Sequence, residues 1–191
     1  MSKSDEVKEV IKAEELALKQ KEISVSEFFT KNRHLLGFDS PAKAILMAVK
    51  EAVDNSLDAS EEMRVLPELI VEIKEITENR FKICVEDNGP GIVKEQIPRV
   101  FAKLLYGSKF HRLKASRGQQ GIGISAAVLY SQLTTGKPAI ITSKIGPKQK
   151  AHHYWLHINT VKNEPEIIKE ESLEWNKDHG TKVELELEGK Y

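Results

Sequence analysis

The chain has 191 residues, of which 40% are hydrophobic, and this is enough for one soluble domain with a single core. No run of residues is long and apolar enough to span a bilayer, and the charged N-terminus lacks the apolar centre of a signal peptide. We therefore expect a cytoplasmic protein with no membrane partner. The single cysteine, Cys84, excludes an internal disulfide and a zinc cluster, and its strand-like surroundings predict a buried structural thiol.

The formal net charge is zero, but the charges are distributed unevenly along the chain. Residues 96–163 contain no Asp or Glu, and eleven Lys and Arg give this stretch a formal charge of +11. Such a segment suits a polyanion, for example a nucleoside triphosphate or a nucleic-acid backbone. A solvated basic face is the alternative, and the sequence leaves both open.

The first part of the chain is predicted to be helical. Residues 1–22 are highly charged, with aliphatic side chains at loosely helical spacing, which predicts an amphipathic arm. A second helix is expected over residues 24–36. Ser40 and Pro41 are typical of a helix start, because serine caps the first turn and proline fits the first helical position. This third helix should run to about Ala59.

The rest of the chain alternates between strand and helix patterns. Strands are predicted over residues 69–76, 81–86, 139–145, 151–160, 166–170 and 181–188, and helices over residues 97–105 and 121–133. Residues 107–120 are basic, polar and interrupted by glycine, which indicates a loop. Hairpins mixed with helices predict an α+β fold. We expect a two-layer sandwich in which helices cover one face of a mixed, mostly antiparallel sheet.

The third helix carries the first candidate site. Glu51 and Asn55 are four residues apart, so their side chains point the same way. Asn and Asp are poor residues for a helix interior, and Asp58 adds another on the same side. A carboxylate can accept a proton from water, and an amide oxygen can ligate Mg²⁺. An ordinary solvated polar face is the alternative.

Three further motifs are weak when each is taken alone. Residues 87–91, Asp-Asn-Gly-Pro-Gly, follow a predicted strand; Asp87 can accept a hydrogen bond from an exocyclic amine, although a plain turn is the alternative. Thr181 opens the last strand and has a hydroxyl that can support such a carboxylate. A glycine-rich segment precedes a predicted helix, whose free N–H groups and dipole favour phosphate. Its residues are Gly118, Gln119, Gln120, Gly121, Ile122 and Gly123.

The order and spacing of the four motifs resemble the GHKL-type ATPase family, which includes the B subunit of DNA gyrase, the Hsp90 chaperones, histidine kinases and the MutL proteins. That family combines a Glu-x-x-x-Asn helix, an Asp-x-Gly-x-Gly turn, a glycine-rich lid end and a late Gly-Thr. The resemblance covers about residues 40–188 and implies a Bergerat-type ATP-binding fold. Within the family, residues 28–38, 100–110 and 116–126 resemble the B subunit of archaeal-type DNA topoisomerase VI.

The resemblance implies roles for individual residues. Glu51 would be the general base that activates the attacking water, and Asn55 would ligate Mg²⁺. Asp87, supported by Thr181, would accept a hydrogen bond from the amino group of adenine. Two glycines would let the backbone pack near the base, and a lid would close over the triphosphate of ATP. These residues are Gly89 and Gly91 for the turn, and Lys109 and Gly118–Gly123 for the lid.

The resemblance also implies a function for the assembled protein. Two copies would form a homodimer when ATP binds, with residues 1–22 crossing to the partner, and would gate duplex DNA in a type IIB DNA topoisomerase. DNA cleavage would belong to the A subunit of topoisomerase VI. Residues 23–191 would form the ATP-binding domain. The transducer domain, which supplies a lysine to the γ-phosphate in the family's topoisomerases, is absent from this chain, so we expect slow turnover.

Two rival functions stay open. One is a nucleotide-sensing dimerisation module with little hydrolysis, and the other is an Hsp90-like chaperone ATPase. A histidine kinase would need a phosphoacceptor helix that the sequence does not contain.

Overall fold

A computed structural model describes residues 24–106 and 122–191 of the chain. The predicted arm and the whole predicted loop, residues 107–120, which include Lys109 and Gly118–Gln120, lie outside the described residues, as does Gly121. The elements run in the order α2 (Val25–Asn32), α3 (Pro41–Met63), β1 (Leu69–Thr77), β2 (Arg80–Asp87), a 3-10 turn (Lys94–Gln96), α4 (Ile97–Ala102), α5 (Gly123–Thr135), β3 (Ala139–Lys144), β4 (Ala151–Asn159), β5 (Glu164–Leu173) and β6 (Gly180–Glu188). Each predicted helix and strand that falls on described residues is present, with shifted ends.

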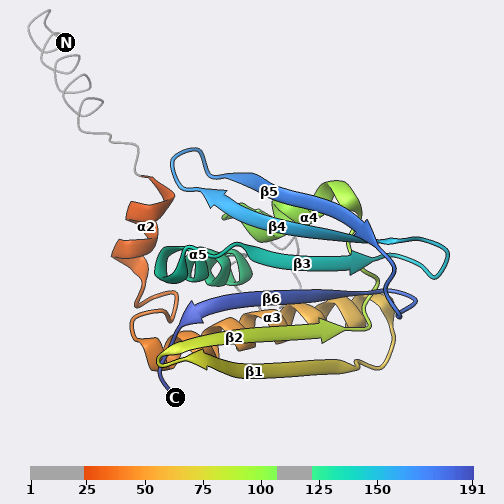
Figure 1. The fold of residues 1–191 in the computed structure, drawn as a ribbon, viewed down its shortest axis with the longest axis horizontal. Coiled ribbons are helices and arrows are strands. Elements are labelled where there is room, and N and C mark those ends of the chain that lie inside the picture. The colour runs from red at the N-terminus through yellow and green to blue at the C-terminus, as the bar shows by residue number, and fades with distance from the viewer. Residues whose placement is uncertain (1–23, 107–121) are drawn as a thin grey trace, which may run out of the picture.

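The strands of the described residues form one six-stranded sheet in the order β1-β2-β6-β3-β4-β5 (Figure 1). All five pairings are antiparallel, so the sheet is more regular than the mixed, mostly antiparallel sheet that the sequence predicts. The last strand, β6, lies between β2 and β3. Because β2 and β6 are antiparallel, the end of β2 at Asp87 lies beside the start of β6 at Thr181.

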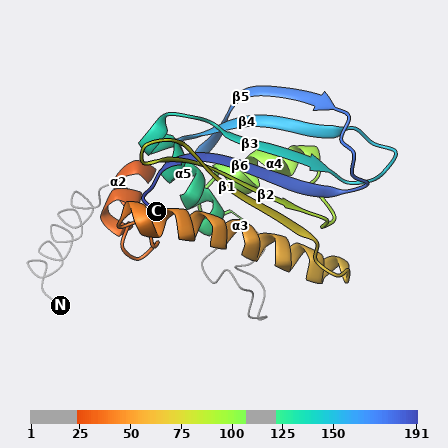
Figure 2. The ribbon, with the colours of Figure 1, turned by 60° about the horizontal axis from the view of Figure 1, so that its bottom comes forward.

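The helices lie on one face of the sheet, as predicted, and α3 runs along that face (Figures 1 and 2). Alternating side chains of β6, Val183, Leu185 and Leu187, are buried in the core beneath the helices. The intervening side chains of β6 form ion pairs with β2, such as Lys82 with Glu184 at 2.8 Å. The two-layer α+β sandwich is therefore confirmed, with an apolar interface on one side of the sheet and a charged surface on the other.

Helix α3 is long because its small residues pack closely on the sheet. Ser40 accepts a hydrogen bond from the backbone N–H of Lys43 at 3.3 Å and caps the helix, as predicted. The helix ends at Met63, one turn beyond the predicted Ala59. That last turn is held by packing, since Ser60 is fully buried and donates its hydroxyl to the carbonyl of Ser56 at 2.9 Å.

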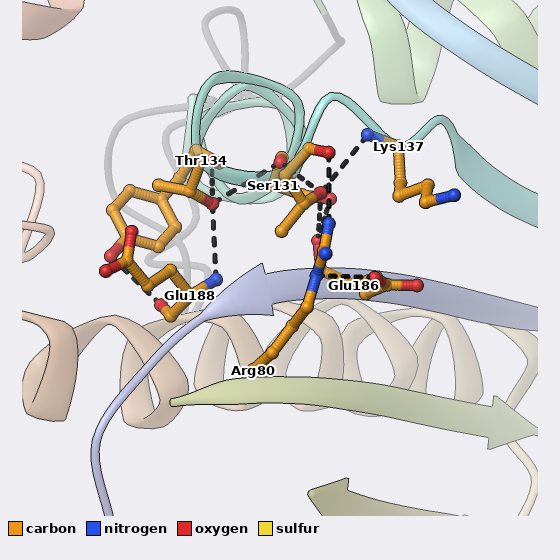
Figure 3. A network of polar contacts seen from close by, with 8 residues as sticks. Arg80, Ser131, Thr134, Lys137, Glu186 and Glu188 are labelled. Atoms are coloured by element: carbon orange, nitrogen blue, oxygen red, sulfur yellow. Dashed lines mark hydrogen bonds and ion pairs between the residues drawn. The ribbon is translucent and has the colours of Figure 1, made fainter. Parts of the chain in front are cut away.

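Helix α5 is attached to β6 by hydroxyl groups near its C-terminal end (Figure 3). Strand β3 pairs with β6 only as far as Glu184, so backbone groups farther along β6 need other partners. Four hydroxyl side chains of α5 bond backbone groups of Glu186 and Glu188 at 2.7–3.2 Å: Tyr130, Ser131, Thr134 and Thr135. Arg80 joins this contact by donating to the carbonyl of Thr135 at 3.1 Å. The attachment fixes α5 along the sheet, and this places its opposite end at the candidate site.

Cys84 lies on β2 and is buried and free, which confirms the predicted structural thiol. Burial raises the pKa of the Cys84 thiol to about 11, so the thiolate is scarce at neutral pH. None of the helices in residues 24–106 and 122–191 has the length and apolar character that crossing a membrane requires.

Candidate functional site

A cavity of about 260 Å³ lies between α3, the segment that follows β2, the end of α4 and the starts of α5 and β6. Six of the predicted site residues line it: Glu51, Asn55, Asp87, Gly91, Gly123 and Thr181. Much of the remaining wall is apolar and comes from Ile92, Val100, Phe101, Ile124 and Val183. A largely apolar cavity with a few converging polar groups is typical of a small-molecule site.

Asp87 is a buried polar group of the cavity wall that three hydrogen bonds hold in place. Its side chain is buried, with 5% of the residue exposed. One carboxylate oxygen accepts the hydroxyl of Ser56 at 2.8 Å, and the other accepts the backbone N–H groups of Gly89 and Thr181 at 2.9 Å each. A carboxylate offers about four acceptor positions. Three are filled by residues that the structure describes, and among these residues no donor takes the fourth, which faces a donor that enters the cavity.

Thr181 supports Asp87 differently from the prediction. Its backbone N–H makes the contact with the carboxylate, while its hydroxyl shares a hydrogen bond with Ser143 at 3.1 Å. Ser143 also accepts the backbone N–H of Ile92 at 2.8 Å, so it joins β3 to both sides of the cavity. The hydroxyl of Thr181 is thus used to fix β6 against β3, and the backbone is left to hold Asp87.

Two serines of this network were missed by reasoning from the sequence. Ser56 lies on the buried side of α3, and its bond to Asp87 was not predicted. The sequence does indicate that Ser56 forms a hydrogen bond, since a hydroxyl on a buried helix face needs a partner. Ser143 gave no signal, because only the register of β3 on β6 places it opposite Thr181.

Gly91 lines the cavity, and the structure gives a reason for a glycine there that the sequence did not predict. Its φ is +72°, and an added Cβ would lie 2.1 Å from the carbonyl oxygen of Lys144 at the end of β3. Only glycine adopts this conformation readily and leaves space for that carbonyl. The turn after β2 therefore packs tightly against β3, and Gly89 contributes the N–H that holds Asp87.

Glu51 and the start of α5 meet at one end of the cavity. The Glu51 side chain is 14% exposed, and one of its oxygens is 3.4 Å from the ammonium of Lys50. That ammonium is closer to Asp54, at 2.7 Å. A Cβ added to Gly123 would lie 1.7 Å from the other carboxylate oxygen of Glu51. The first residue of α5 is thus in direct contact with the Glu51 carboxylate, which a larger residue would displace.

For the ATP hydrolysis that the family resemblance implies, Gly123→Ala is expected to lower the rate by at least about tenfold, the change for a barrier increase of about 1.4 kcal/mol. The added methyl group must push Glu51 out of place, because the Cβ position overlaps the carboxylate. Affinity for a non-hydrolysable ATP analogue should fall less than the hydrolysis rate. The control is Gly146→Ala, whose Cβ meets no atom within 4 Å. Equal hydrolysis rates for the two variants would contradict a role for this contact.

Ile122 is buried and directly precedes α5, but it provides no side-chain cap. Backbone N–H groups of the first turn have no partner within the helix, and an anion beside them is stabilised by the dipole. The other predicted phosphate-binding residues, Lys109, Gly118, Gln119, Gln120 and Gly121, lie outside the described residues. Their roles stay predictions.

Tyr106 was not expected at the site, yet it lines the cavity beside Val100 and Phe101 of α4. Its hydroxyl donates to the side-chain oxygen of Gln96 at 2.5 Å. The residue lies in a loop-like part of the sequence, where no periodicity marks it. Within the part of the chain that the structure describes, no group of three or more His, Cys, Asp or Glu is arranged to hold a metal ion.

Comparisons with known proteins identify a family for this chain. A family model described as "Histidine kinase-, DNA gyrase B-, and HSP90-like ATPase" matches residues 44–185. The chain is 62% identical over 179 residues to the B subunit of Type 2 DNA topoisomerase 6 from Methanococcoides burtonii, covering 94% of this chain. It is 61% identical over 173 residues to the protein of the same name from Archaeoglobus fulgidus, covering 91% of this chain.

The chain spans only 29% of the length of each of these two relatives. Among solved structures, it is similar to the 43K ATPase domain of Thermus thermophilus gyrase B in complex with an aminocoumarin. The identity is 17% and the TM-score 0.48, over 82% of this chain and 38% of that one.

Proposed function

Because this chain belongs to the histidine kinase-, DNA gyrase B- and HSP90-like ATPase family, we propose that ATP binds in the cavity described above and is hydrolysed there with Glu51 as general base. The observation that supports this most directly is Asp87. It is a buried carboxylate held by three donors, with one acceptor position left. The amino group of adenine is a donor of the right kind for that position, whereas the carbonyl of guanine is not.

The positions of Glu51 and Asn55 suit the other end of ATP. Both line the cavity on α3, and four residues of helix separate them by about 6 Å along the axis. The carboxylate of Glu51 can accept the proton of an attacking water. The start of α5, which touches Glu51, offers backbone N–H groups to phosphate oxygens. The triphosphate would therefore run from the Asp87 end toward the start of α5.

Asn55 fits Mg²⁺, which takes oxygen ligands and usually keeps several waters and substrate phosphate oxygens in its shell. Its amide oxygen is the hard donor that this ion needs, and Asn55 lines the cavity about one turn of α3 from Glu51. The ion would neutralise phosphate charge in the bound nucleotide. By resemblance, Lys109 and Gly118–Gly121 would add phosphate contacts from the lid.

For the whole protein, we propose the ATPase module of a type IIB DNA topoisomerase. Support comes from relatives named as the B subunit of Type 2 DNA topoisomerase 6, with identities of 61–62% over more than nine-tenths of this chain. Duplex DNA and the A subunit of topoisomerase VI would be the partners. Residues 1–22 would be an arm and residues 23–191 the ATP-binding domain, which would form a homodimer when ATP binds.

Calorimetry and light scattering on the same samples test the proposal. Titration of the chain with a non-hydrolysable ATP analogue should give one site per chain in the presence of Mg²⁺ and weaker binding in EDTA. The guanine analogue should bind at least about tenfold more weakly, since it leaves a buried acceptor without its donor. Doubling of the mass with the analogue would support ATP-driven dimerisation. No heat with any nucleotide would contradict ATP binding by this chain.

A further inference from the structure

The turn between β4 and β5 is held by its own hydrogen bonds and contains an asparagine in a left-handed conformation. Asn163 has a φ of +52°, a region that asparagine enters more readily than most residues. Its backbone N–H donates to the carbonyl of Asn159 at 2.9 Å. The side chain of Asn159 accepts the N–H groups of Val161 and Lys162 at 3.1 and 2.9 Å. The turn thus holds its shape through its own hydrogen bonds, independently of α4.

The side chain of Asn163 binds the backbone that leaves α4. Its amide oxygen accepts the N–H of Leu104 at 2.9 Å, and its amide nitrogen donates to the carbonyl of Leu104 at 3.1 Å. Next to this pair, Lys103 and Glu164 form an ion pair at 2.6 Å. Both backbone groups of Leu104, whose side chain is buried, are therefore satisfied by one distant residue.

The bound segment leads directly to the cavity. Leu104 is followed by Leu105 and then by Tyr106, which lines the cavity and is held to Gln96 by its hydroxyl. Leu105 has a φ of +60°, a conformation that is costly for a leucine and persists only where neighbouring contacts fix it. The contacts on its two sides are the Asn163 pair and the Tyr106 bond. Without the first of them, Leu105 can relax and Tyr106 can move.

We propose that Asn163 is a positioning residue of the nucleotide site: by holding both backbone groups of Leu104, it sets the place of Tyr106 in the wall that contacts the bound nucleotide. This inference rests on the proposed ATP binding. Asn163 does not itself line the cavity, so it acts through the segment between α4 and Tyr106. The turn is also linked to α2, because the carbonyl of Thr160 accepts the N–H of Val25 at 2.8 Å.

The chain offers a matched control in the hairpin between β1 and β2. Asn79 has a φ of +60°, is exposed, and lies at the end of β2 that is opposite to Asp87. Glycine at either position keeps the left-handed backbone and removes the side chain. We expect Asn163→Gly to weaken binding of the Mg²⁺-bound ATP analogue about five- to tenfold, roughly the value of one ordinary hydrogen bond. Asn79→Gly should stay within about twofold of the unsubstituted chain.

Thermal stability and a second substitution separate positioning from a general loss of stability. A lower melting temperature for Asn163→Gly with unchanged nucleotide affinity would overturn the proposal. Combined with Tyr106→Ala, the Asn163→Gly change should have little further effect on affinity, because both act through the same contact. Additive effects of the two substitutions would overturn the route through Tyr106. Failure of the unsubstituted chain to bind the analogue would instead count against the proposed function.

Asn163→Asp tests the same contact with a side chain of nearly the same shape. It keeps the oxygen that accepts the N–H of Leu104, but it replaces the donor to the Leu104 carbonyl with a second acceptor, and the two oxygens repel. Its affinity for the analogue should therefore also fall by at least about fivefold. An affinity equal to that of the unsubstituted chain, with a lowered melting temperature, would also overturn the proposal.

Discussion

Replacing Glu51 with glutamine is expected to lower ATP hydrolysis by about 10²- to 10⁴-fold, the usual contribution of a general base. Glutamine has nearly the same shape, so it should still fit against Gly123, where the Glu51 carboxylate is in close contact with the start of α5. Its amide cannot accept the proton of water. Affinity for the ATP analogue should therefore stay within about threefold. Phosphate release in a single turnover measures the first effect, and calorimetry measures the second.

Asp39→Asn is the control for this substitution. Asp39 lies just before the same helix, and its carboxylate pairs with Lys43 at 2.8 Å. It does not line the cavity, so its loss should leave single-turnover hydrolysis nearly unchanged. If Glu51→Gln and the unsubstituted chain released phosphate equally fast, Glu51 would not be the base. A chain that binds ATP and hydrolyses it negligibly in every variant would favour the nucleotide-sensing module.

The fold was predictable from the sequence where local chemistry decides it. The start of α3 follows from a serine cap and a proline, both of which act within one turn of helix. Its end was predicted one turn too early, because Ser60 and its neighbours are held by packing against the sheet. Packing usually outweighs helix propensity in this way. The alternation of Val183, Leu185 and Leu187 likewise predicts β6 but not its place between β2 and β3.

Only part of the candidate site was predictable, because contacts between distant parts of the chain decide the rest. Glu51 and Asn55 share a helix face, which spacing alone indicates. The meeting of Asp87 with Thr181 depends on pairing across 94 residues of sequence, and it was expected only through the family resemblance. The position of Ser143 opposite Thr181 depends on the register between β3 and β6, and no local sequence pattern indicates it. Gly123 was predicted to admit phosphate. The structure adds a second reason for a glycine there, since the missing side chain leaves room for the Glu51 carboxylate.

Asp87→Asn is expected to weaken ATP binding by about 10- to 150-fold, the value of a hydrogen bond to a charged group. The protein should tolerate the change. The asparagine oxygen can still accept the N–H groups of Gly89 and Thr181, and the new amide can donate to Ser56, whose hydroxyl can reverse its role. The melting temperature should therefore fall only modestly, and the main loss should be in recognition of the base.

The same substitution should change which base the cavity prefers. An amide at this position can present an N–H to the ligand, which opposes the amino group of adenine and suits the 6-carbonyl of inosine triphosphate. We expect the preference for ATP over inosine triphosphate to shrink or reverse in Asp87→Asn, as measured by competition calorimetry. Glu86→Gln is the control, since Glu86 precedes Asp87 and pairs with Lys177 at 2.9 Å outside the cavity. An unchanged base preference in Asp87→Asn would mean that Asp87 holds the turn after β2 and does not read the base.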